Sequence, residues 1–385
     1  MSQPGGIEIF RDLFIVFVAA RAFGELFLRL RQPAILGEIL AGVLLGPHVL
    51  GWVRASGVLS AVAQIGIVFL LFQVGLENRF SDLREVGATA TAVAVSGVVV
   101  PFAAGYLLLS ALGYPSHESL FAGAALVASS ASVAARLLRD LGVLQRRESQ
   151  TILAAAVIDD VLGLLVLAVV AETTRGGFDA RSIAVLVVEV AVFLALVATV
   201  GTRLVRRLGP RLSRLHLEDG PFVVGVAACL GLAALARAVG LAGTVGAFLA
   251  GMLFAEVRES YDMSRTIRPV TNFLTPFFFV VTGTEVVPGT FTRPAVLLLF
   301  AGVFAVAVVG KLVPGAIAAR RFGPRGALIV GAGMVPRAEV GIIVASLGLS
   351  SGVIGERLYP VLLGVSALTW IVAPIALRSL FGRTR

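Results

Sequence analysis

Cysteine, lysine and histidine are scarce in this 385-residue chain, and charged residues of every kind are few. Cys229 is the single cysteine, so the sequence excludes an intramolecular disulfide and a cysteine-based metal cluster. The three histidines fall near expected loops, which argues against a histidine-based metal site. Only 14% of the residues are charged, whereas soluble proteins carry about 25%. With 58% hydrophobic residues, the composition predicts a membrane protein and argues against a soluble enzyme.

Long apolar runs follow one another from end to end of the chain. A helix needs about 20 predominantly apolar residues to cross a bilayer, and clusters of proline, glycine and arginine divide the runs. The first run has no cleavage-like tail, so we expect a retained helix and not a signal peptide. The sequence predicts an all-α polytopic protein with thirteen membrane-spanning helices, at residues 8–28, 33–50, 58–76, 87–112, 118–138, 149–171, 182–202, 221–236, 241–255, 269–287, 294–319, 325–349 and 359–377.

The formal net charge of +9 is better explained by membrane orientation than by nucleic-acid binding. Most arginines outside the expected spans or at their ends, Arg136 and Arg139 among them, belong to the loops that follow odd-numbered spans or to the C-terminal tail. Positively charged loops favour the cytoplasmic side of the membrane. We therefore expect the N-terminus outside, the C-terminus in the cytoplasm, and no nucleic-acid partner.

A weak internal repeat relates two halves of the chain at an offset of about 208 residues. The stretch GEILAGVL at 37–44 is similar to GAFLAGML at 246–253, and VGLE at 74–77 is similar to TGTE at 282–285. This offset pairs the first six expected spans with the last six and leaves the seventh as a linker. Because seven spans separate corresponding helices, the halves have opposite orientations, as in many secondary transporters. The alternative is a generic helical bundle with glycine contacts.

Two expected spans contain signals for a break in the helix near the middle of the membrane. Ser129, Ser130 and Ser132 interrupt the fifth span, and their hydroxyls can satisfy carbonyls that unwinding releases. Pro336 interrupts the twelfth span, where it removes a backbone donor. The two stretches occupy matching positions in the repeat, so we expect two discontinuous helices with partly charged termini inside the membrane. The alternative for each is a kinked but continuous helix.

Asp159 and Asp160 lie near the centre of the sixth expected span. A charge there costs about 2.5–3.5 kcal/mol on insertion scales, so each is a functional candidate. Neighbouring residues on a helix differ by about 100°, so one carboxylate can meet another helix while the other faces a cavity. Lys311, the only lysine, lies in the eleventh span, and a buried lysine loses its proton more readily than an arginine. The structural alternative is an inert Asp159–Lys311 pair that holds two helices together.

The remaining charges near the spans are expected to have other roles. Arg337 and Glu339 flank the expected break in the twelfth span, where their formal charges cancel and they can neutralise helix termini. We expect a structural role for them more than a role in transport. Glu38, Glu189 and Glu256 lie nearer to helix ends or interfaces and are assigned no ion-binding role.

The sequence AAVIDDVLGL at residues 155–164 resembles the aspartate-pair helix of bacterial sodium/proton antiporters in the monovalent cation:proton antiporter superfamily, most closely the NapA type. Three further stretches resemble signatures of the same family, namely Gln32-Pro33 with GEILAGVLLGP at 37–47, FLLFQVGLE at 69–77 and PRAEVG at 336–341. The resemblance covers essentially the whole chain.

This resemblance implies an NhaA-like antiporter fold with two crossed discontinuous helices, and a homodimer in the lipid bilayer. It implies dimerisation and scaffold helices within residues 1–76 and 221–287, and a mobile core within 87–171 and 294–377. The helix at 182–202 is the implied linker.

The resemblance also implies roles for individual residues. Asp160 becomes the main carrier of the ion, and Asp159 pairs with Lys311 until sodium binding disrupts the pair. Ser129 falls where the family has a threonine beside the ion, and Ser130 is included with it as a candidate ligand. Ser132, Pro336, Arg337 and Glu339 support the discontinuous helices.

The expected function is exchange of sodium or lithium for protons across a bacterial cytoplasmic membrane, by an elevator-like movement and without a cofactor. A bound cation stabilises an ionised carboxylate, so sodium and protons compete for the same aspartates. One alternative is potassium/proton exchange of the Kef-like branch, because carboxylate oxygens alone do not fix ion size. A more distant alternative is an intramembrane aspartyl protease. That chemistry needs aspartates facing each other from separate helices, which Asp159 and Asp160 cannot do.

Overall fold

The computed structural model describes most of the chain as helices joined by short connections. The described residues are 6–30, 32–55, 57–174, 180–212, 220–256, 263–286, 294–337, 341, 344–345, 348–349, 352–355 and 357–382. Within these residues there is no β-sheet, and an isolated antiparallel bridge joins Ser129 to Arg337. The expectation of an all-α protein is confirmed for this part of the chain.

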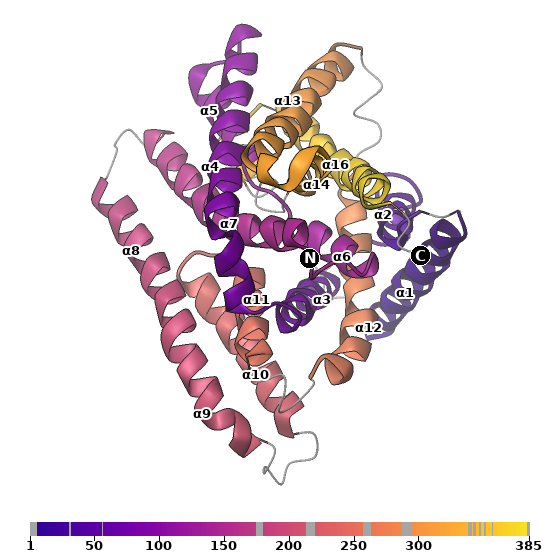
Figure 1. Cartoon of the computed structure of the whole chain (residues 1–385). Helices are drawn as coiled ribbons and strands as arrows, with labels where there is room; N and C mark the ends of the chain where they lie inside the picture. Colours follow the sequence, from indigo (N-terminus) through magenta and orange to yellow (C-terminus); the bar gives the residue numbers. More distant parts are fainter. Residues whose placement is uncertain are drawn as a thin grey trace.

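In the first half of the chain, the described residues form the helices α1 to α9, of which α8 and α9 are continuous. Their bounds are α1 (Gly6–Arg29), α2 (Ala34–Leu45), α3 (Gly57–Leu76), α4 (Phe80–Ala111), α5 (Ser116–Ala125), α6 (Ala131–Asp140), α7 (Arg147–Thr174) and α8 (Ala180–Leu196). A π-helical turn at Val197–Gly201 carries α8 into α9 (Thr202–Leu212). Figure 1 shows α8 and α9 as one long rod at the edge of the molecule, with α1 on the other side of the view.

The second half begins after the long rod. Its described helices are α10 (Gly220–Ala238), α11 (Gly243–Ala255), α12 (Met263–Thr284), α13 (Pro294–Ala318), α14 (Gly323–Gly333) and α16 (Leu358–Phe381). The helix α12 begins six residues before the expected span, because helical hydrogen bonding continues into polar residues that a hydropathy pattern excludes.

Helix lies at each of the thirteen expected ranges, but the helices differ in length. Among the described residues, six stretches are long and apolar enough to cross a membrane, in α3, α4, α7, the α8–α9 rod, α13 and α16. The 12-residue α2 is about 18 Å long at 1.5 Å per residue, short of a hydrocarbon layer of about 30 Å. The number of membrane crossings therefore stays a prediction.

The helices that pack extensively against each other fall into two sets. One set contains α1, α2, α3, α10, α11 and α12, and the other contains α4, α5, α7, α13, α14 and α16. The short helix α6 lies between the sets, because it packs on α7 of the second set and on α3 of the first.

Two close helix crossings organise the first set. The helix α2 crosses α12 where Gly42 meets Gly283, and α3 crosses α11 where Gly75 meets Gly251. A Cβ on any of these four glycines would collide with a backbone carbonyl of the facing helix. The offset of the sequence repeat exchanges Gly42 with Gly251 and Gly75 with Gly283, so the two crossings correspond to each other.

We predict that Gly75→Ala destabilises the folded protein, because its Cβ would meet the carbonyl of Phe248 and force α3 away from α11. Overpacking of a tight contact costs about 1–3 kcal/mol. The matched control is Gly231→Ala on α10, where nothing lies within 4 Å of the added Cβ and helix propensity favours alanine. Thermal unfolding in detergent measures both variants, and equal melting temperatures would contradict the prediction.

Candidate functional site

The centre of the molecule holds a buried ion pair between α7 and α13. Lys311 Nζ lies 2.8 Å from Asp159 Oδ1, and both side chains are 0% exposed. Two charges removed from water are stable only when they are paired in good geometry. The only lysine of the sequence therefore has Asp159 as its direct partner.

Gly97 on α4 makes room for the lysine. A Cβ at this position would lie 3.3 Å from Lys311 Cδ and 3.4 Å from Nζ, closer than most contacts allow. The stem of Lys311 thus lies across a bare stretch of the α4 backbone. Sequence reasoning missed Gly97, because nothing in the sequence distinguishes it among the 43 glycines.

The second oxygen of Asp159 is held by an interrupted helix. The Ser129 backbone N–H donates to Asp159 Oδ2 at 2.7 Å. This amide is available because α5 ends at Ala125 and α6 begins only at Ala131. The expected break in residues 118–138 is therefore present, and the alternative of a continuous kinked helix is wrong for this span.

A second interruption lies beside the first. The helix α14 ends at Gly333, and Pro336 accepts a hydrogen bond on its carbonyl from the Ser130 backbone N–H at 2.7 Å. The Ser129 hydroxyl donates to the carbonyl of Met334 at 3.0 Å. The two unwound stretches thus run antiparallel for a short distance and are tied together by backbone groups.

The other serines support the start of α6. Ser130 Oγ accepts a hydrogen bond from the Val133 N–H at 3.4 Å and forms a 2.8 Å hydrogen bond with Ser132 Oγ. This is N-capping, in which a side-chain oxygen satisfies a free amide in the first turn. In this conformation Ser130 and Ser132 bond to α6 and to each other, and the Ser129 hydroxyl bonds to Met334.

Arg337 is a second buried cation, and it lies where the two unwound stretches meet, the unwound crossing. Its side chain is 0% exposed. Its guanidinium donates to the carbonyls of Leu126 and Ala307. Leu126 is the residue that caps the C-terminus of α5, where a helix carries partial negative charge. Arg337 therefore places positive charge at this helix end. Glu339, its expected neighbour in the charge balance, lies outside the described residues.

The backbone of Arg337 is fixed by α16. Its N–H donates to Thr369 Oγ1 at 3.1 Å, and its carbonyl accepts from Trp370 Nε1 at 2.5 Å. Sequence reasoning missed both partners. The one available signal was the rarity of tryptophan, of which the chain has two.

Asp160 occupies the neighbouring face of α7 and is 7% exposed. It lines a cavity of about 590 Å³ bounded by α3, α7, α10 and the start of α11, with Leu167 and Arg237 further along the wall. A separate, narrow space of only about 10 Å³ lies beside Asp160 toward the N-terminal end of α7, next to Leu153 and Phe248. One carboxylate of the adjacent pair thus meets a lysine, and the other reaches an open space.

Comparison with known proteins assigns this arrangement to a family. The family described as "Sodium/hydrogen exchanger, transmembrane" matches residues 13–382. The chain belongs to the sodium/hydrogen exchanger family. The exchanger is therefore a multi-pass membrane transporter and not an enzyme, which removes the protease alternative.

Individual relatives cover the exchanger from end to end. The Na⁺/H⁺-K⁺ antiporter GerN of Bacillus cereus is 31% identical over 97% of this chain and 97% of its own length. The high-affinity Na⁺/H⁺ antiporter NhaS3 of Synechocystis is 31% identical over 96% of this chain and 89% of its own. The structure of the sodium proton antiporter MjNhaP1 from Methanocaldococcus jannaschii superposes with a TM-score of 0.69 over 97% of this chain and 94% of its own, at 16% identity. The fold is therefore shared with a known antiporter.

We predict that Trp370→Phe lowers the stability of the folded protein, because it leaves the buried carbonyl of Arg337 at the unwound crossing without its indole donor. A buried group that loses its partner costs about 1–3 kcal/mol. The other tryptophan supplies the control, since Trp52 is 61% exposed. Unfolding in detergent should occur at a lower temperature for Trp370→Phe and be unchanged for Trp52→Phe. An equal effect of the two substitutions would argue against the importance of this hydrogen bond.

Proposed function

We propose that this exchanger moves Na⁺ or Li⁺ against protons across a bacterial cytoplasmic membrane, with Asp160 as the main ion ligand. The observation that carries the proposal is a buried Asp159–Lys311 pair directly beside a second carboxylate that reaches a cavity. No cofactor is required for this chemistry, because the transported ions are themselves the reactants.

Competition for the carboxylates couples the two ions. A cation binds an ionised carboxylate and is expelled when the carboxylate takes up a proton. When sodium recruits Asp159 as well as Asp160, it displaces Lys311, which can then lose its own proton. Ion binding and proton uptake at these three groups are therefore coupled. If two protons move for each sodium ion, the exchange is electrogenic.

We infer that the exchanger works by alternating access with an elevator-like movement. In this reading α1–α3 and α10–α12 form the scaffold of a homodimer, and the second set of helices is the moving core with the two crossed discontinuous helices. We infer thirteen spans in two inverted repeats. The two glycine crossings support the repeat, because the repeat offset relates each glycine of one crossing to a glycine of the other. With the N-terminus outside and the C-terminus in the cytoplasm, the cavity at Asp160 opens outward.

Potassium/proton exchange is a second candidate. The relative GerN is named for both sodium and potassium, and two carboxylates do not by themselves select an ion of one size. The first aspartate favours sodium, because potassium-efflux relatives typically have a different residue there and this chain retains Asp159.

We predict that Asp160→Asn abolishes exchange, because an amide binds no proton and loses most of its attraction for a cation. The measurement is the sodium-driven pH change in proteoliposomes, repeated with lithium and potassium over a pH series. Glu189→Gln is the matched control, since Glu189 is an exposed acid on α8. A sodium-driven pH change that persists in Asp160→Asn would overturn the assignment.

We predict that Lys311→Gln slows exchange and changes its pH profile, because glutamine cannot release or take up the proton that Lys311 exchanges. Thermal unfolding of the same variant separates this effect from a loss of folding. A lower melting temperature with an unchanged pH profile would mean that the Asp159–Lys311 pair is inert and holds two helices together.

A further inference from the structure

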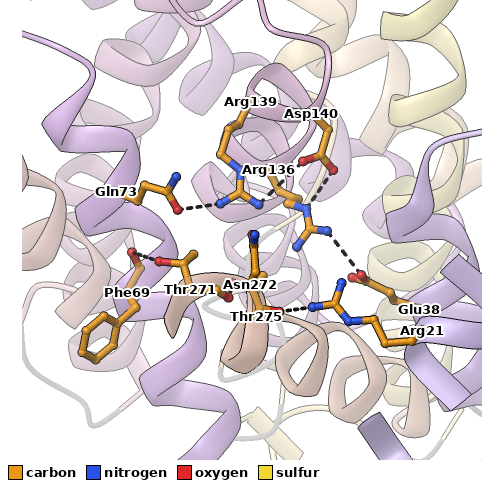
Figure 2. Close-up of polar contacts among 10 residues, drawn as sticks. All are labelled: Arg21, Glu38, Phe69, Gln73, Arg136, Arg139, Asp140, Thr271, Asn272 and Thr275. Carbon is orange, nitrogen blue, oxygen red and sulfur yellow. Dashed lines mark hydrogen bonds and ion pairs between the residues drawn. The ribbon is translucent and has the colours of Figure 1, made fainter. Parts of the chain in front are cut away.

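A polar network joins α6 to the first set of helices, away from the Asp159–Lys311 pair. Arg136 Nη2 lies 3.3 Å from Glu38 Oε1 on α2. One turn further on, Arg139 Nη1 donates to Gln73 Oε1 on α3 at 2.9 Å. Asp140 ties the two arginines together, at 2.8 Å from Arg136 Nε and 3.6 Å from Arg139 Nη2. Figure 2 shows both guanidinium groups reaching from α6 toward the facing helices.

Most of the network is buried, although the sequence places Arg136 among loop arginines and the Asp140 side chain is 31% exposed. Glu38 and Gln73 are each 1% exposed and Arg136 is 6% exposed. The guanidinium also lies 5.9 Å from the centre of the Phe279 ring on α12. A buried ion pair resists separation, because each partner would be left uncompensated. These contacts therefore link α6 to α2, α3 and α12.

The pairing is nevertheless incomplete. Glu38 Oε2 and Arg136 Nη1 are both buried and have no hydrogen-bond partner among the described residues. A bidentate arginine–carboxylate pair would use both oxygens and would be stronger. The single 3.3 Å contact is therefore weaker than the bidentate pair that these two side chains can make.

The position of α6 connects this network to the ion site. The helix α6 begins at the unwound crossing, where Ser130 caps its N-terminus. Ala131 in its first turn lines the narrow space beside Asp160. Leu153, seven residues before Asp160 on α7, lines that narrow space. Leu167, seven residues after Asp160, lines the open cavity. The network thus lies on the N-terminal side of α7, where Glu38, Arg136 and Asp140 line a separate cavity of about 940 Å³ that does not reach Asp160. The cavity that does reach Asp160 opens on the C-terminal side.

We propose that Glu38, Gln73, Arg136 and Arg139 form a latch, the α6 latch, that keeps the exchanger closed on the N-terminal side of α7 and so sets the fraction of molecules that face outward. This inference rests on the alternating access proposed above. Separating α6 from α2 and α3 would open the narrow space beside Asp160 toward the cytoplasm.

Two cysteine reporters measure which side of the ion site is open. The background is Cys229→Ala, which removes the only native thiol. Leu153→Cys and Leu167→Cys lie on the same face of α7 on either side of Asp160. A membrane-impermeant thiol reagent is added outside the vesicles. Inside-out vesicles test Leu153→Cys from the cytoplasmic side, and right-side-out vesicles test Leu167→Cys from the outer side. The ratio of the two labelling rates reports the balance between the two open states.

Two substitutions change the latch in opposite directions. Glu38→Gln removes the charge that faces Arg136, so labelling of Leu153→Cys should speed up and that of Leu167→Cys should slow down. Gln73→Glu turns the hydrogen bond of Arg139 into an ion pair, which should shift the ratio the other way. Loss or gain of a hydrogen bond to a charged group should change the ratio of labelling rates by about tenfold or more, because it stabilises one of the two states only. The control is Glu85→Gln, which removes the exposed 3.7 Å contact to Arg147 within the second set and should leave the ratio unchanged.

A double variant separates the latch from general loosening. When Glu38→Gln is combined with Arg136→Gln, the ratio should equal that of the stronger single variant, because the same contact is lost once. If the ratio is unchanged in Glu38→Gln and Gln73→Glu while only the melting temperature falls, the network is static packing and the latch is overturned. Additive effects of the two substitutions would also count against it.

The experiment also separates this inference from the proposed function. In the reporter background, sodium and pH should shift the ratio of labelling rates if access alternates. A ratio that responds to neither ion would overturn alternating access itself. A ratio that responds to both ions but not to Glu38→Gln or Gln73→Glu would overturn the latch alone.

Discussion

The buried Asp159–Lys311 pair is the constraint on which the surrounding structure depends. Both side chains are 0% exposed, and burial of an ammonium or a carboxylate without an opposite charge beside it is very costly. The helix break supplies the Ser129 amide for the other carboxylate oxygen, and Gly97 leaves space for the lysine stem. An uninterrupted helix in place of α5 and α6 would use that amide in its own hydrogen bonding. The unwound stretch is thus part of the ion pair's environment.

Arg337 meets the same demand for compensation in a different way. It is fully buried, and its guanidinium donates to backbone carbonyls, one of them at the C-terminus of α5. A half-helix that ends inside the molecule carries partial charge, and a cation at its C-terminus stabilises it. Trp370 and Thr369 on α16 then fix the backbone of Arg337. The crossing is therefore connected to α13 and α16, and these elements form one polar framework around the aspartates.

Much of this framework could be predicted from the sequence, because charges are rare in apolar helices. That rarity identified Asp159, Asp160 and Lys311, and the serine and proline stretches predicted the breaks. The sequence could not identify Gly97 or Thr369, whose importance lies in what they contact. Arg136 was placed with the loop arginines because a hydropathy pattern cannot distinguish a charge in water from one paired with a buried glutamate on another helix. The ends of the helices differed for a similar reason, since backbone hydrogen bonds extend beyond the apolar residues.

The crossings at Gly42–Gly283 and Gly75–Gly251 bring backbone directly against backbone. A contact between side chains can adapt through a change of rotamer, but a contact between main chains has no such freedom. Each crossing therefore fixes the distance between its two helices. Since α3 also packs on α12, the two crossings together hold α2, α3, α11 and α12 in one rigid arrangement. A side chain added at any of the four glycines would therefore displace a whole helix and not a single side chain.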